Sequence, residues 1–276
     1  LSHKEDLYEM WKRVSLNKSE LLKLKIFSKK IKINFICSVF DIESLEMVKK
    51  INVDAYKIAS SDITDQRLQE YISREKKPII ISTGMASENE IRVAIKNLKS
   101  KNIAILHCIS LYPCEEKFAN LNRITELSKK FYFSIGYSDH CVGINASIIA
   151  ISMGAKVIEK HFTLNKKKVG LDHALSADPK DLEIICDFAK KFNLYKGKGS
   201  IEPSKYEKRF QKFFRKGIYF KKDVKKNENL SNENLIIRRP KNNIHPKYYK
   251  SLLNKISTKS FKKGDSINFK FLRKTN

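Results

Sequence analysis

Two histidines close consecutive apolar runs, and imidazoles in that arrangement suit a divalent metal. His140 ends the run FYFSIGYSDH at 131–140, and His161 lies near the end of KVIEKHFT at 156–163. If both runs are neighbouring parallel strands, about 4.8 Å apart, the two side chains meet at one edge of the sheet. Two neutral imidazoles there form half of a metal site. The alternative is a pair of hydrogen-bonded histidines without a metal.

Three carboxylates lie close to these histidines in the sequence. Asp139 and Glu159 flank them, and Asp172 follows in the loop KKKVGLDHALS. We interpret Asp139 and Glu159 as catalytic or as supports for the metal ligands, and Asp172 as a residue that grips a substrate hydroxyl. Ordinary polar positions on a strand end and a surface loop are the alternatives.

An anion site is indicated by polar residues at three other strand ends. Lys57 interrupts the apolar run AYKIAS, Ser82 ends IIS in PIIISTG, and Ser138 lies in GYSDH. A lysine in an apolar strand needs an anionic partner. Hydroxyls and free backbone N–H groups before a helix suit a phosphate. Each residue alone is weak evidence for an anion site, and their convergence on one edge of the sheet is stronger evidence.

Repeated strand–helix units must position these residues. Amphipathic stretches such as IESLEMVKKI, which places Leu45, Val48 and Ile51 at helical spacing, separate the apolar runs, which predicts buried parallel strands. Six units at this spacing favour a (β/α) barrel, whose sites gather at the carboxyl ends of the strands. A full barrel has eight strands, and the sequence opens with Leu on a helical pattern, so we expect a barrel lacking its first two strand–helix units. An open doubly wound sheet is the alternative. The six runs lie at 33–40, 55–60, 78–84, 103–110, 131–140 and 156–163.

The pattern changes after a last predicted helix at 181–195. We expect a barrel domain at 1–195, a Gly/Pro/Lys-containing linker at 196–212, and a small β-rich domain at 213–276. That last domain holds a near-repeat, in which DVKKNENL aligns with SFKKGDSI. Asn227 and Gly264 occupy one shared position, and both residue types tolerate a left-handed backbone.

Composition restricts the class of protein. The 276 residues carry a formal charge of +26, but Lys is spread along the whole chain, so we expect no nucleic-acid partner. No apolar run approaches the roughly 20 residues of a membrane span, which predicts no membrane association. The five cysteines form no CxxC pair, which favours reduced thiols and a cytoplasmic protein.

Taken together, the motifs resemble the sialic acid synthase family, which includes N-acetylneuraminate, legionaminate and pseudaminate synthases. The tail, with IIRRP and the KKGD turn, resembles the family's C-terminal antifreeze-like (SAF) domain. The resemblance covers nearly the whole chain. The motifs are YKIAS (56–60), PIIISTGM (78–85), LHCISLYP (106–113), GYSDH (136–140) and IEKHFT (158–163).

The resemblance implies a barrel plus SAF domain in a domain-swapped homodimer. It also implies a divalent metal, Mn²⁺ or Mg²⁺, on His140 and His161. By position, phosphoenolpyruvate contacts carry over to Lys57, Ser82 and Ser138. Ser110 stands where the family often has Asn, and Asp62 replaces a more usual Glu. The remaining substrate-binding positions are Asp62, Ser110, Tyr112, Asp172 and Arg239, of which Arg239 reaches the sugar's N-acyl group in the partner's site.

The implied reaction condenses phosphoenolpyruvate with N-acetylmannosamine or a related amino sugar. The family's first strand carries an active-site glutamate, and its second strand carries an active-site lysine. Because we expect both strands to be absent from residues 1–276, we expect these residues alone to show little or no turnover. An inactive truncated synthase is therefore an alternative. Two further alternatives are a nucleic-acid-binding protein, based on the charge, and a barrel aldolase in which Lys57 forms a Schiff base.

Overall fold

A six-stranded parallel sheet organises the first of two compact units, Leu1–Gly197 and Lys198–Asn276. The computed structural model describes residues 6–170, 172–242 and 244–274. The strands pair strictly in chain order, as the six apolar runs predict. They are β1 (Ile36–Ser38), β2 (Ala55–Ile58), β3 (Ile79–Ser82), β4 (Ile103–Cys108), β5 (Ser134–Asp139) and β6 (Ile158–Lys160).

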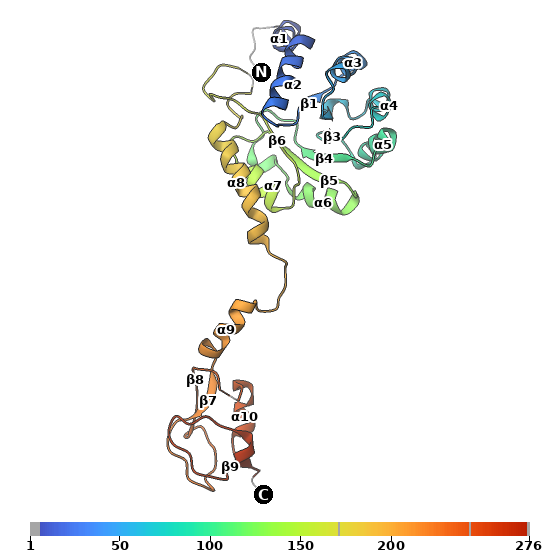
Figure 1. Ribbon diagram of the computed structural model, residues 1–276. Helices are drawn as coiled ribbons and strands as arrows, with labels where there is room; N and C mark the ends of the chain where they lie inside the picture. Colours follow the sequence, from blue (N-terminus) through green and yellow to red (C-terminus); the bar gives the residue numbers. More distant parts are fainter. Residues whose placement is uncertain (1–5, 171, 243, 275–276) are drawn as a thin grey trace. The chain divides into compact units, whose positions relative to one another are not determined.

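Helices precede the sheet and connect its strands (Figure 1). Local capping defines several of their starts: Asp41 and Ser44 form a capping box at the start of the third helix, and Asp178 and Asp181 form one at the start of the eighth. The helices of this unit are α1 (Leu7–Val14), α2 (Lys18–Lys30), α3 (Ile42–Ile51), α4 (Gln66–Ser73), α5 (Glu88–Leu98), α6 (Asn122–Lys130), α7 (Asn145–Ser152) and α8 (Pro179–Lys196).

The first unit is a partial TIM barrel, as the sequence predicts. Figure 1 shows α3, α4, α5 and α6 in a row along the outside of a curved sheet, whereas a doubly wound sheet carries helices on both faces. Helix α3 buries Leu45, Val48 and Ile51, the residues whose spacing indicates its inner face. They pack into one core with strand residues such as Tyr56 and Ile105. This packing brings the carboxyl ends of the strands to one edge.

The second unit is small and β-rich. Its elements are α9 (Lys205–Phe214), β7 (Gly217–Phe220), β8 (Leu235–Arg238), α10 (Tyr249–Leu252), β9 (Ile256–Ser257) and β10 (Leu272–Arg273). Strand β7 pairs antiparallel with β8, and β9 pairs antiparallel with β10. The segment expected as a linker is helical from Lys205, because Ser204 and Glu207 form a capping box.

The near-repeat of this unit is real. Val224 and Phe261, one from each copy, form an antiparallel bridge. Asn227 and Gly264 have φ angles of 69° and 93°, so both adopt the left-handed conformation that their shared position predicts. The two Lys-rich turns therefore have equivalent roles around one core.

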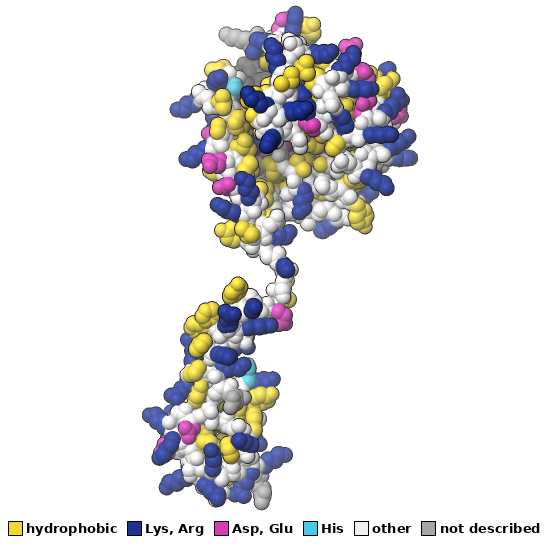
Figure 2. Space-filling model, viewed as in Figure 1, with side chains coloured by type: hydrophobic (Ala, Val, Ile, Leu, Met, Phe, Trp, Pro, Cys, Tyr) yellow, Lys and Arg dark blue, Asp and Glu magenta, His cyan; other side chains and the backbone are white. Residues whose placement is uncertain are grey.

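Figure 2 shows Lys and Arg scattered over the visible side of both units, with no basic stripe. Within residues 6–170, 172–242 and 244–274, no helix combines the length and apolarity needed to cross a bilayer.

Candidate functional site

His140 and His161 lie side by side where β5 and β6 end. Their ring centroids are 5.4 Å apart, and Asp139 and Lys160, the residues before them, are register partners. The Nδ1 atom of His140 lies 2.8 Å from the carbonyl oxygen of Ile109. A carbonyl only accepts, so Nδ1 carries a proton, and in the neutral imidazole Nε2 keeps its lone pair. That tautomer suits metal ligation.

Tyr112 and Asp172 border the histidine pair. The Tyr112 ring lies 4.1 Å from the His140 ring and 5.9 Å from the His161 ring, centroid to centroid. Burial raises the pKa of the Tyr112 phenol to about 12, so it stays protonated and can donate a hydrogen bond. Asp172 Oδ2 lies 3.7 Å from His161 Nδ1. Burial lowers the pKa of His161, and the Asp172 charge opposes that change.

A lysine, a serine and a carboxylate from three strands meet beside the histidines. The Lys57 side chain, from β2, is 91% buried, with Nζ 3.7 Å from Glu159 Oε2. Ser138, on β5, donates from Oγ to Glu159 Oε1 at 2.9 Å. Burial lowers the pKa of Lys57, while the Glu159 charge opposes that shift. The cluster is therefore a buried cation only partly compensated by its own carboxylate.

Two serines at this edge have hydroxyls without a partner. Ser82 and Ser110 are not exposed, and among the described residues their Oγ atoms have no hydrogen-bond partner. A buried hydroxyl is normally satisfied, so each such group needs an explanation. Gly84 leaves this region open, because a Cβ there would collide with the Ser110 hydroxyl and crowd Ser60. These serines therefore fit a ligand that supplies acceptor oxygens.

Other predicted site residues lie apart from this cluster or behind it. Asp62 accepts a hydrogen bond from Ser61 at 2.7 Å, and its charge acts on Lys57 from a distance. Arg239 belongs to the second unit, where Nε donates to the Phe214 carbonyl at 2.7 Å. Asp139 is fully buried and bonds to Ser147 of α7.

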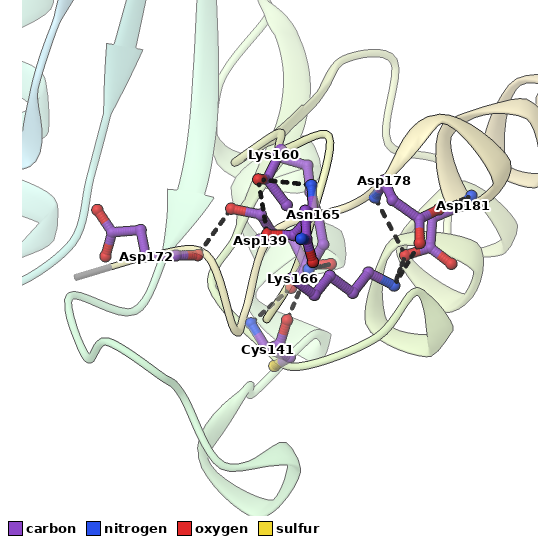
Figure 3. Close-up of polar contacts among 10 residues, drawn as sticks. Asp139, Cys141, Lys160, Asn165, Lys166, Asp172, Asp178 and Asp181 are labelled. Carbon is purple, nitrogen blue, oxygen red and sulfur yellow. Dashed lines mark hydrogen bonds and ion pairs between the residues drawn. The ribbon is translucent and has the colours of Figure 1, made fainter. Parts of the chain in front are cut away.

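Sequence reasoning missed Lys160, which forms a buried ion pair with Asp139 (Figure 3). A signal was available. Lys160 precedes His161 just as Asp139 precedes His140, and residues adjacent on a strand point to opposite faces. His107, on β4, is packed inside the unit: its ring stacks on Tyr137, and Nε2 bonds to the Ala119 carbonyl.

A curved parallel sheet with a cationic and histidine-bearing carboxyl edge defines an α/β-barrel protein whose site suits an anionic ligand. The model of the NeuB family matches residues 2–201, and that of the SAF domain matches residues 215–273. The chain therefore belongs to the NeuB family of sialic and nonulosonic acid synthases, with a C-terminal SAF domain.

Relatives agree with this assignment. An uncharacterized protein of Methanocaldococcus jannaschii is 39% identical over 97% of this chain and 80% of its own length. The N,N'-diacetyllegionaminic acid synthase of Campylobacter jejuni is 36% identical over 95% of this chain and 80% of its own. A solved N-acetylneuraminic acid synthetase from Leptospira borgpetersenii, in complex with citrate, is 36% identical with a TM-score of 0.71, covering 76% of this chain and 74% of that one.

Proposed function

We propose that the protein condenses phosphoenolpyruvate with an N-acyl amino sugar to give a nonulosonic acid and phosphate. N-acetylmannosamine would give N-acetylneuraminate, and a 2,4-diacetamido-trideoxy sugar would give a legionaminate-type product. The observation that carries the proposal is the convergence of Lys57, Ser138 and Glu159 beside the His140–His161 pair. Anion-holding groups and potential metal ligands thus share one edge of the barrel.

In this proposal the cluster holds the phosphate of phosphoenolpyruvate. The Lys57 cation neutralises it, and the hydroxyls of Ser82 and Ser110 donate to its oxygens. The Ser138 hydroxyl joins them by turning away from Glu159 Oε1. Phosphate oxygens would satisfy the two hydroxyls that lack partners. The cost of burying the lysine cation is best offset when it is paired with a doubly charged anion such as this phosphate.

The reaction forms a carbon–carbon bond and breaks a carbon–oxygen bond. The enol carbon attacks the aldehyde of the open-chain sugar, whose oxygen takes up a proton and becomes a hydroxyl. Water adds at the adjacent carbon and loses a proton. Phosphate then leaves with its bridging oxygen, and the new hydroxyl becomes the ketone as its proton passes to the phosphate. In this proposal Glu159 takes the water proton, and its contacts with Lys57 and Ser138 support the role by keeping a carboxylate beside the groups that hold the phosphate. Tyr112 and Asp172 border the space where the sugar would lie.

A divalent metal, Mn²⁺ or Mg²⁺, fits the histidine pair. The carbonyl bond of His140 Nδ1 leaves Nε2 available as a ligand. In the described ranges, no group of three or more His, Cys, Asp or Glu side chains could hold a metal. His140 and His161 would therefore supply two ligands, which is half of a site. When bound there, the metal supplies Lewis-acid polarisation of the aldehyde.

We further propose a cytoplasmic, domain-swapped homodimer. In it, Arg239 of one protomer would reach the sugar's N-acyl group in the site of its partner. Within the described residues, Arg239 Nε donates to the Phe214 carbonyl of its own unit, and a single hydrogen bond is readily exchanged for one to a ligand.

The test is phosphate release from phosphoenolpyruvate by the native gene product with Mn²⁺ and each sugar. Mass spectrometry of the product identifies the sugar used. We expect phosphate and a nine-carbon acid in equal amounts with one of the sugars. Phosphate release without a nine-carbon product would contradict the condensation.

A further inference from the structure

The residue before each histidine takes part in one buried ion pair. Asp139 precedes His140 on β5, Lys160 precedes His161 on β6, and the two are register partners. Lys160 Nζ lies 3.1 Å from Asp139 Oδ2, with side-chain exposures of 5% and 0%. Adjacent strand residues point to opposite faces, so this pair lies behind the sheet edge that carries the histidines.

Further hydrogen bonds fix both members of the pair (Figure 3). Lys160 Nζ also donates to the Cys141 carbonyl at 2.6 Å. Asp139 accepts from the Cys141 backbone N–H at 2.9 Å and from the Ser147 hydroxyl at 2.6 Å. The bonds to Cys141 hold the backbone on the far side of His140. The pair and its hydrogen bonds therefore tie Asp139 and Cys141, on either side of His140, to Lys160, which precedes His161.

We infer that the Asp139–Lys160 pair is a positioning element that sets the separation and orientation of the His140 and His161 imidazoles. This inference rests on the proposed metal-dependent function. Among the residues that the structure describes, the hydrogen bonds and the ion pair of both side chains go to each other, to Cys141 and to Ser147, and none goes to an imidazole, so the pair positions the rings through the backbone. The spacing of two metal ligands on different strands depends on how those strands are tied at their ends. Here the strand ends are joined by a short, buried ion pair.

The informative variant removes both charges. Removing one partner leaves a buried uncompensated charge and endangers folding, whereas removing both is often close to neutral for stability. We therefore expect D139N/K160M to fold with a similar melting temperature. Its Mn²⁺ dissociation constant should rise about 10- to 100-fold, the usual effect of losing groups that orient metal ligands. The Mn²⁺ electron paramagnetic resonance spectrum should broaden.

Lys25 and Asp54 offer the matched control. They form an ion pair at 2.5 Å, and Asp54 immediately precedes β2, at the amino-terminal end of the strands. The variant D54N/K25M removes the same two charges there and should keep the original Mn²⁺ affinity. Folded D139N/K160M with unchanged Mn²⁺ affinity and spectrum would overturn the inference.

Two single variants test the same inference if the double variant does not fold. Lys160 lines a cavity of about 430 Å³ with Ile158, Leu182 and Ile185, so Arg can be accommodated there. Lys160→Arg should keep Mn²⁺ affinity, and Ser147→Ala, which keeps both charges but removes one hydrogen bond to Asp139, should weaken it; equal affinities would reject the positioning role. If His161→Ala binds Mn²⁺ as tightly as the unaltered protein does, the proposed metal site is wrong, and the failure lies there rather than in the positioning role.

Discussion

Lys57 and Glu159 meet across the sheet, with Nζ 3.7 Å from Oε2. They stand on β2 and β6, between which three other strands lie. Strands this far apart in a flat sheet would be about 19 Å apart, at about 4.8 Å per strand. The Lys57–Glu159 contact therefore exists because the sheet curves into part of a barrel, whereas Ser138 reaches Glu159 as its register partner on the neighbouring strand.

Replacing Lys57 with Met should separate binding from stability. We expect phosphoenolpyruvate to bind about 10- to 100-fold more weakly, since a hydrogen bond to a charged group contributes about 1.5–3 kcal/mol. The melting temperature should stay level or rise, because a buried charge is removed and Glu159 is 43% exposed. Calorimetry and thermal unfolding measure the two. Unchanged phosphoenolpyruvate affinity would contradict the role of Lys57.

The pH dependence of phosphoenolpyruvate binding should report on the same lysine. Burial lowers the pKa of Lys57 below the ordinary value for lysine. The bound phosphate requires the cation, so affinity should be full at low pH and fall as pH rises through that lowered pKa. Lys57→Arg should abolish this fall, because Arg stays protonated. Titrations between about pH 7 and 10 check this, and a fall that persists in the Arg variant would assign it to another group.

Ser82→Ala and Ser110→Ala should weaken phosphoenolpyruvate binding without destabilising the fold. Their hydroxyls have no partner among the described residues, so no internal hydrogen bond is lost. Ser147→Ala is the contrasting variant, because this hydroxyl donates to the buried Asp139 carboxylate at 2.6 Å. Its loss should cost about 1.5–3 kcal/mol of unfolding free energy. Urea unfolding of the three variants would refute the account if all lose similar stability.

His161→Ala should abolish Mn²⁺ binding at the barrel edge. Two imidazoles form the protein part of the proposed site, and losing one leaves too few ligands. His245→Ala, in the second unit, is the control, because its ring accepts from the Lys247 backbone N–H of its own unit. Isothermal calorimetry with Mn²⁺ distinguishes them, and similar affinity in both variants would reject His161 as a ligand.

Much of the barrel could be predicted from the sequence because buried parallel strands read as apolar runs. The six runs found all six strands, and the Leu45, Val48 and Ile51 spacing found the inner face of α3. Strand ends could likewise be located, so His140 and His161 were expected together. Local pattern is enough where each element buries one continuous face.

The partners of buried polar groups could not be predicted in the same way. Glu159 was anticipated only as an edge carboxylate, but its contact with Lys57 depends on the curvature of the sheet. Asp139 carried a proposed catalytic role because it neighbours His140. Its contacts with Ser147 and Lys160 lie on the opposite face, a distinction that requires the register of β5 against β6.

The most direct test of the central claim is anomalous diffraction from crystals soaked with Mn²⁺ and phosphoenolpyruvate. The account predicts a manganese peak at His140 and His161, with the phosphate against Lys57, Ser82 and Ser138. A manganese peak away from both histidines, or phosphoenolpyruvate bound without contact to Lys57, would contradict it.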